Sequence, residues 1–187
     1  MASLIDLVKE HLGPQELSQI SQQLGTDQAT TQQAVNAALP ALVGGLANTA
    51  QQPQGSSGIQ QLMSSHAGVL GGLGSLLGAG APADGGSVLG RILGQHQPQV
   101  QQGVQQASGL GSDQTRKLLM ILAPIVLGAL AKRAMSHGNA NDQAAIQQSL
   151  QKDGQQAREQ AEAHSPHLGG LLGKIMGMAE SPEMRNR

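Results

Sequence analysis

An apolar phrase containing a proline occurs twice in this chain of 187 residues, and it limits the possible folds more than any other feature. Residues 39–47 read LPALVGGLA and residues 123–131 read APIVLGALA, so that Pro124 follows Pro40 by 84 residues. With slips of two or three residues, the same offset aligns LGTDQ with LGSDQ and IQQLMSSH with IQQSLQKD. Matches that gather at one offset indicate a duplication. We therefore predict two tandem units, at residues 1–84 and 85–168.

Each unit is predicted to consist of short helices. Ser3 and Asp6 have the spacing of a capping box at the start of the first helix. A second helix is expected to stop at Gly25, and Thr26 or, in the second unit, Ser112 to cap a third. These signals predict an all-α fold of two tandem short-helix bundles.

The repeated phrase is predicted to form the buried central helix of each bundle. A proline inside a helix costs about 3 kcal/mol, so we expect a kink or a break at Pro40 and at Pro124. Gly44-Gly45 and Gly128-Ala129 remove side-chain bulk and would let another helix approach closely. The apolar run 118–131 is shorter than the roughly 20 residues that span a bilayer. We therefore expect no transmembrane segment.

A glycine-rich stretch at residues 68–80 carries apolar residues at helical spacing. The spacing predicts an amphipathic helix over 69–77 whose opposite face is only glycine and serine. Glycine weakens a helix by up to about 1 kcal/mol per position, so this helix would need packing partners, and a loop that contains leucines is the alternative. We predict that five residues of this stretch contribute to self-association: Val69, Leu70, Leu73, Leu76 and Leu77.

The beginning of a third repeat is predicted at the end of the chain, at residues 169–187. Residues 86–94 read GSVLGRILG and residues 169–177 read GGLLGKIMG, followed by a polar tail. This terminal helix either closes the second unit within the chain or docks on a neighbouring chain. Its apolar stripe, also predicted for self-association, comprises Leu171, Leu172, Ile175 and Met176.

Charge and composition favour association over attraction to charged polymers. The formal net charge is −1, and residues 28–83 contain no Asp, Glu, Lys or Arg. Low charge removes the repulsion that keeps like molecules apart. The chain contains no Cys, Phe, Trp or Tyr, and its first residues do not have the pattern of a signal peptide. A cytoplasmic location is the default expectation.

DNA association is the alternative function that the sequence offers. Residues 17–35 have the pattern of a helix-turn-helix, a short helix, a glycine turn and a second helix. The second helix, however, carries Gln and Thr in place of the cations that bind phosphates. In the second unit the possible nucleic-acid contacts are Arg116 and Lys117. Without aromatic residues, bases cannot stack on the protein. Peripheral membrane association through the glycine-rich helix is a second alternative.

The sequence contains no pattern that predicts catalysis or a cofactor. The motifs GxSxG, GxGxxG and the phosphate-binding loop are absent, although GLGSLLG and GGLLGK come close to the last two. Glu162, His164 and His167 are the nearest to a metal-ligand cluster, but Pro166 interrupts the helix that would bring them together. We expect no enzyme activity, no metal and no cofactor.

The duplicated units resemble a bacterial family known only as a domain of unknown function, with the YidB-like proteins as relatives. The resemblance is carried by LPALVGGLA and APIVLGALA, by LGTDQ and LGSDQ that precede them, and by the short helix GSVLGRILG. It covers most of the chain. The resemblance implies an all-helical fold and supplies no catalytic residues. The predicted function is therefore non-enzymatic binding, most directly to a second copy, as a homo-oligomer or a head-to-tail assembly.

Overall fold

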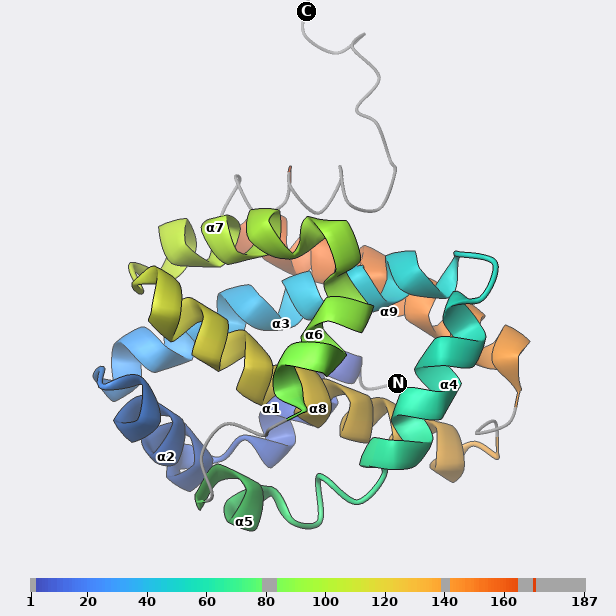
Figure 1. The fold of residues 1–187 in the computed structure, drawn as a ribbon, viewed down its shortest axis with the longest axis horizontal. Coiled ribbons are helices and arrows are strands. Elements are labelled where there is room, and N and C mark those ends of the chain that lie inside the picture. Colours follow the sequence, from blue (N-terminus) through green and yellow to red (C-terminus); the bar gives the residue numbers. More distant parts are fainter. Residues whose placement is uncertain (1–2, 79–83, 139–141, 165–169, 171–187) are drawn as a thin grey trace, which may run out of the picture.

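The computed structural model describes residues 3–78, 84–138, 142–164 and 170, and within these ranges the chain is helical without strands. The all-α prediction is confirmed. The elements, shown in Figure 1, are α1 (Leu4–His11), α2 (Pro14–Leu24), α3 (Gln28–Ala50), α4 (Gly55–His66), α5 (Leu73–Gly78), α6 (Gly85–Leu93), the 3₁₀ turn η1 (Gly94–His96), α7 (Gln97–Ser108), α8 (Ser112–Ser136) and α9 (Gln143–His164).

Local capping signals define several helix ends. Ser3 and Asp6 form the predicted capping box of α1, in which the Ser3 hydroxyl accepts from the Asp6 N–H over 3.1 Å. Gly25 ends α2 in the left-handed conformation, with φ of 66°, as expected of a C-terminal glycine. The predicted cap of α3 is wrong. Asp27, not Thr26, is the N-cap, because its carboxylate accepts from the Thr30 N–H over 2.8 Å.

The cap of α8, in contrast, is one residue earlier than predicted. Gly111, not Ser112, is the N-cap, and its N–H donates to Gln114 Oε1 over 3.0 Å. A backbone donor bound by the side chain three residues ahead is half of a capping box, so a hydroxyl at the cap is not required here.

The Asp27 cap gives a pH-dependent prediction. Hydrogen bonds from the Thr30 hydroxyl and then from the Thr30 N–H hold the pKa of the Asp27 carboxyl below its ordinary value. The stabilisation by this cap is therefore complete above the unfolded-state pKa of about 3.9 and is lost as the pH falls through the folded pKa. NMR titration of the carboxyl should give a lowered pKa that Thr30→Ala moves back toward the ordinary value. An unchanged pKa in Thr30→Ala would contradict this assignment.

The two central helices are α3 and α8, and both prolines lie buried within them. Each helix continues through its proline, so the break is excluded, and the kink, the other expected outcome, stays a prediction. We attribute this to packing: side chains on all sides of the proline turns are buried, and this burial offsets the cost of the lost hydrogen bond. The helices also repeat a buried detail, since the hydroxyls of Thr31 and Thr115 each donate over 2.9 Å to a carbonyl four residues earlier.

The two predicted units share one hydrophobic core. The predicted boundary at residue 84 falls directly before α6, and the helices of the second half follow in an order like that of the first. In space, however, α9 packs along α3 of the first unit, and α4 packs against α8 of the second. Helices α1 and α6 each contact both central helices (Figure 1). One cluster of buried residues runs through both halves. The repeat therefore describes the sequence pattern, while packing crosses the boundary.

A buried polar cluster joins the first helix to the last two. The Asp153 carboxylate of α9 pairs with the Arg133 guanidinium of α8, with 3.0 Å between Nη1 and Oδ1. Asp153 Oδ1 also accepts from the Leu4 N–H at the start of α1 over 3.2 Å. Ser149 accepts a further hydrogen bond from Arg133. Because an N-terminal N–H of α1 has its acceptor on α9, the cluster ties the two ends of the described fold together.

Candidate functional site

A cleft lies where α3, α4 and α6 meet. It consists of two adjoining cavities of about 440 and 360 Å³, a size typical of ligand sites. Thr49, Gln52, Arg91 and Ile92 line both cavities. The first cavity is completed by Pro53, Gln54, Gly55, Gly58, Ile59 and Leu62, and the second by Gly45, Asn48, Leu93, Gly94, Gln95 and His96.

Close backbone approaches at two glycines shape this cleft. A Cβ on Gly55 would overlap the Thr49 carbonyl, so glycine lets α4 begin directly against the end of α3. A Cβ on Gly45 would meet the Leu93 side chain and would lie 3.3 Å from the Ile92 carbonyl oxygen. This glycine, one of the predicted small residues after Pro40, thus lets α6 approach α3, as expected from the sequence.

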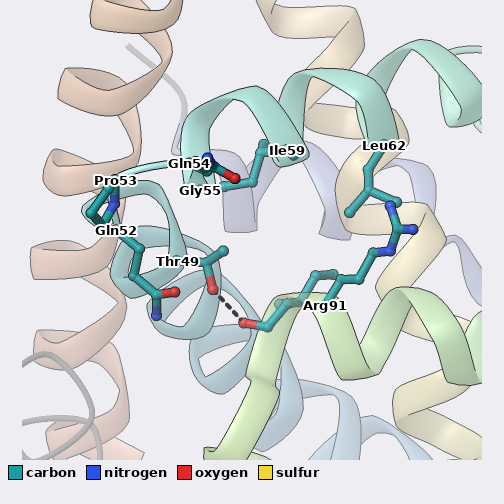
Figure 2. A pocket seen from close by; sticks show the side chains of 10 residues that line it. Thr49, Gln52, Pro53, Gln54, Gly55, Ile59, Leu62 and Arg91 are labelled. Carbon is teal, nitrogen blue, oxygen red and sulfur yellow. Dashed lines mark hydrogen bonds between the residues drawn. The ribbon is translucent and has the colours of Figure 1, made fainter.

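The wall of the first cavity is mainly apolar, and the carbonyl oxygen of Ile92 in this wall accepts a hydrogen bond. The Thr49 hydroxyl donates to the Ile92 carbonyl oxygen over 2.8 Å, across the gap between α3 and α6. Figure 2 shows Ile59 and Gly55 on one side of the hollow, Thr49 beside them, and Arg91 on the opposite side. If an apolar group entered the cavity, the Ile92 carbonyl would therefore keep its hydrogen bond.

Arg91 supplies the charge of the cleft. Among the residues that line the two cavities there is no other Arg or Lys and no Asp or Glu. Arg91 is exposed, and within the described ranges no ion pair involves its guanidinium. Its side chain extends along the cavity toward Leu62 (Figure 2). The cleft thus combines an apolar wall with one cation at its edge, and sequence reasoning missed it because its residues come from separate helices.

The family model of a bacterial protein of unknown function, DUF937, matches residues 6–133. The chain belongs to this family. The matched range contains α2 to α7, most of α8 and the whole cleft, whereas α9 and residues 169–177 follow it. No curated protein and no solved structure matches the chain. The expected relation to the YidB-like proteins stays a prediction.

The glycine-rich stretch of this DUF937 chain packs against the chain's own core. Residues 67–72 form turns and α5 begins only at Leu73, so the predicted helix over 69–77 is wrong in its first half. Leu73 and Leu77 are buried, and Val69 and Leu70 are half-buried against the core. The side chain of Leu76 lies outside the described part.

The reason for this turn is a close contact with a central helix. A Cβ on Gly128 of α8 would lie 3.1 Å from the His66 carbonyl oxygen and 3.3 Å from Val69 Cβ. Glycine-rich backbone at 67–72 gains no side-chain packing as a helix, while as a turn it brings Val69 and Leu70 onto α8. The predicted close approach at Gly128 is therefore present, and the last residue of α4 makes it together with the turn that follows.

The structure describes only some of the remaining predicted site residues. The terminal residues Leu171, Leu172, Ile175 and Met176 lie outside the described residues, as does His167. Arg116 and Lys117 are exposed near the start of α8. In the first unit, α2, the left-handed Gly25 and α3 follow one another as the helix-turn-helix pattern predicts, with Thr31 buried and Gln32 and Gln33 exposed. No group of three His, Cys, Asp or Glu that could hold a metal occurs among the described residues.

Helix α8 of the DUF937 chain is longer than the apolar run that predicted it. It extends over 25 residues, so the argument from shortness against a membrane span does not hold. By length and composition α8 could cross a bilayer, and 78% of its apolar window is buried among the other helices. The same values are typical of the core helix of a bundle, and the absence of a transmembrane segment stays a prediction.

Proposed function

We propose that this DUF937 chain is a non-enzymatic interaction protein that self-associates through residues 169–177. The observation that carries the proposal is that α6, which has the same apolar pattern as residues 169–177, buries its apolar side chains. Helix α6 buries Val88, Leu89, Ile92 and Leu93, whose equivalents in the terminal segment are Leu171, Leu172, Ile175 and Met176. Four such side chains would each gain about 1.5–3 kcal/mol from full burial, so the segment favours a surface that covers it.

The packing of the described body favours a second chain as that surface. The two central helices are already contacted by the two short helices of this type, α1 and α6. A third segment of the same pattern has no third central helix among the described residues. Of the other predicted association residues, Leu73 and Leu77 are buried in the chain's own core, and Val69 and Leu70 pack half-buried against it. The terminal segment is therefore the proposed donor.

The surface of the body is compatible with approach of a second copy. With a net charge of −1 and no Asp, Glu, Lys or Arg in residues 28–83, long-range repulsion between copies is weak. Met135, at 58% exposure, is the only large apolar side chain strongly exposed on the described part of the surface. Association through a specific donor segment is thus favoured over association through a broad apolar patch.

Light scattering across a concentration series tests the proposal, with detection at the peptide bond because the chain has no Trp or Tyr. We expect the mean mass to rise with concentration, and the variant Leu172→Gln/Ile175→Gln to remain a monomer over the same range. Lys174→Gln, a polar change in the same segment, is the matched control and should associate as the unaltered chain does. A chain that is monomeric at every concentration, or a double variant that associates normally, would contradict the proposal.

DNA association is a second candidate because α2, Gly25 and α3 have the order of a helix-turn-helix. The exposed residues at the start of α3 include Gln28, Gln32 and Gln33, which cannot neutralise phosphates. Binding would then depend on Arg116 and Lys117 of α8. A gel shift that weakens steeply with salt, and is lost in Arg116→Gln/Lys117→Gln, would favour this function over self-association.

A further inference from the structure

We infer that the cleft between α3, α4 and α6 is the acceptor site for the terminal segment of a second copy. This inference rests on the proposed function and adds the place where the donor binds. The occupant comprises residues 169–183, which combine the apolar pattern of Leu171 to Met176 with the acidic residues Glu180 and Glu183. The cleft offers the matching combination, a mainly apolar wall and one cation that has no ion pair with any described residue.

The apolar part of the match lies in the first cavity. Ile59 and Leu62 of α4 and Ile92 of α6 form its deep wall, and the exposed Pro53 lies at its edge. With a volume of about 440 Å³, the cavity has room for apolar side chains of the donor. Because Thr49 already donates to the Ile92 carbonyl, docking of leucine or isoleucine there leaves that carbonyl paired.

The charged part of the match concerns Arg91. No ion pair within the described ranges involves it, and no Asp or Glu lines either cavity, so an acidic group of the donor would meet an uncompensated cation. In the sequence Glu180 and Glu183 follow the apolar residues of the donor closely, ahead of Arg185 and Arg187. Lys174 is the sequence equivalent of Arg91, which is exposed in α6, so the pattern predicts that Lys174 stays outside the apolar contact.

A charge exchange in the full chain tests this assignment. Arg91→Glu should weaken self-association about tenfold, because it replaces attraction to the donor glutamates by repulsion. Glu180→Arg/Glu183→Arg should weaken it to a similar extent. A chain that carries all three changes should recover most of the lost affinity, which a merely misfolded variant would not do. Arg116→Glu is the matched control, since it makes the same change in net charge at an exposed residue outside the cleft.

The outcomes separate this inference from the proposed function. If the unaltered chain does not associate, or Leu172→Gln/Ile175→Gln has no effect, the proposed function fails and the acceptor site fails with it. If the terminal double variant is monomeric but Arg91→Glu behaves as Arg116→Glu does, the donor is retained and the cleft is excluded as its acceptor. The assignment would also be overturned if the chain with all three changes bound no more tightly than Arg91→Glu or Glu180→Arg/Glu183→Arg.

Discussion

Replacing Asp153 by alanine is expected to destabilise the fold by about 3–5 kcal/mol, because the change leaves a charge buried without its partner. The side chains of Asp153 and Arg133 are only 6% and 15% exposed, so water cannot replace the missing carboxylate fully. The same change removes the acceptor of the Leu4 N–H at the start of α1. Three helices, α1, α8 and α9, would lose their common polar contact.

Urea unfolding followed by far-ultraviolet circular dichroism measures this loss, since the chain lacks aromatic residues for fluorescence. Glu162→Ala is the matched control. It removes the pair between Arg158 and Glu162 on the same helix, where the Glu162 side chain is 49% exposed, and should cost less than about 1 kcal/mol. The assignment of Asp153 as a structural tie would be wrong if the two variants lost similar stability.

Gly85→Ala is expected to destabilise the protein by about 1–3 kcal/mol, because it forces the start of α6 away from a central helix. A Cβ at Gly85 would be 3.1 Å from the Met120 carbonyl carbon and closer still to the carbonyl oxygen. The obstruction is backbone of α8, which cannot rotate aside as a side chain can. The displacement would also disturb Val88 and Leu89, which α6 buries in the core.

Gly90→Ala provides the opposite expectation on the same helix. Nothing lies within 4 Å of a Cβ at Gly90, and alanine favours a helix over glycine by about 0.5–1 kcal/mol, so this variant should be more stable than the unaltered chain. Thermal unfolding of both variants should therefore give melting temperatures on opposite sides of the parent value. A stabilised Gly85→Ala, or a strongly destabilised Gly90→Ala, would contradict the packing of α6 described above.

Local signals predicted the individual helices well where a helix end carried its own chemistry. The capping box of Ser3 and Asp6 and the C-terminal Gly25 are present because their hydrogen bonds and backbone angles depend on neighbouring residues only. The prediction was wrong for residues 69–72, where the spacing of leucines favoured a helix. There, contact with Gly128 of α8 decided the outcome, and that contact is remote in sequence.

Of the proposed donor segment and acceptor cleft, only the donor segment could be predicted from the sequence. The likeness of residues 169–177 to α6 is visible in the sequence, because the same pattern of apolar residues recurs. The cleft is not visible, since Thr49, Gly55 and Arg91 come from three helices and have no common spacing. Only the close packing at Gly45 and Gly55 brings these helices to the same place.

The sequence by itself determined the helical class, several helix ends and the burial of the two central helices, because these follow from periodicity, caps and a repeated apolar phrase. The tertiary structure alone decided which helices pair, so that α9 lies along α3 and α4 against α8. The physical reason is the nature of the core. With no aromatic residue, the helix faces are built from Leu, Ile, Val, Met and Ala, and such faces differ little in burial energy. The choice among them depends on shape and on close approach at particular glycines, which exist only once the chain has folded.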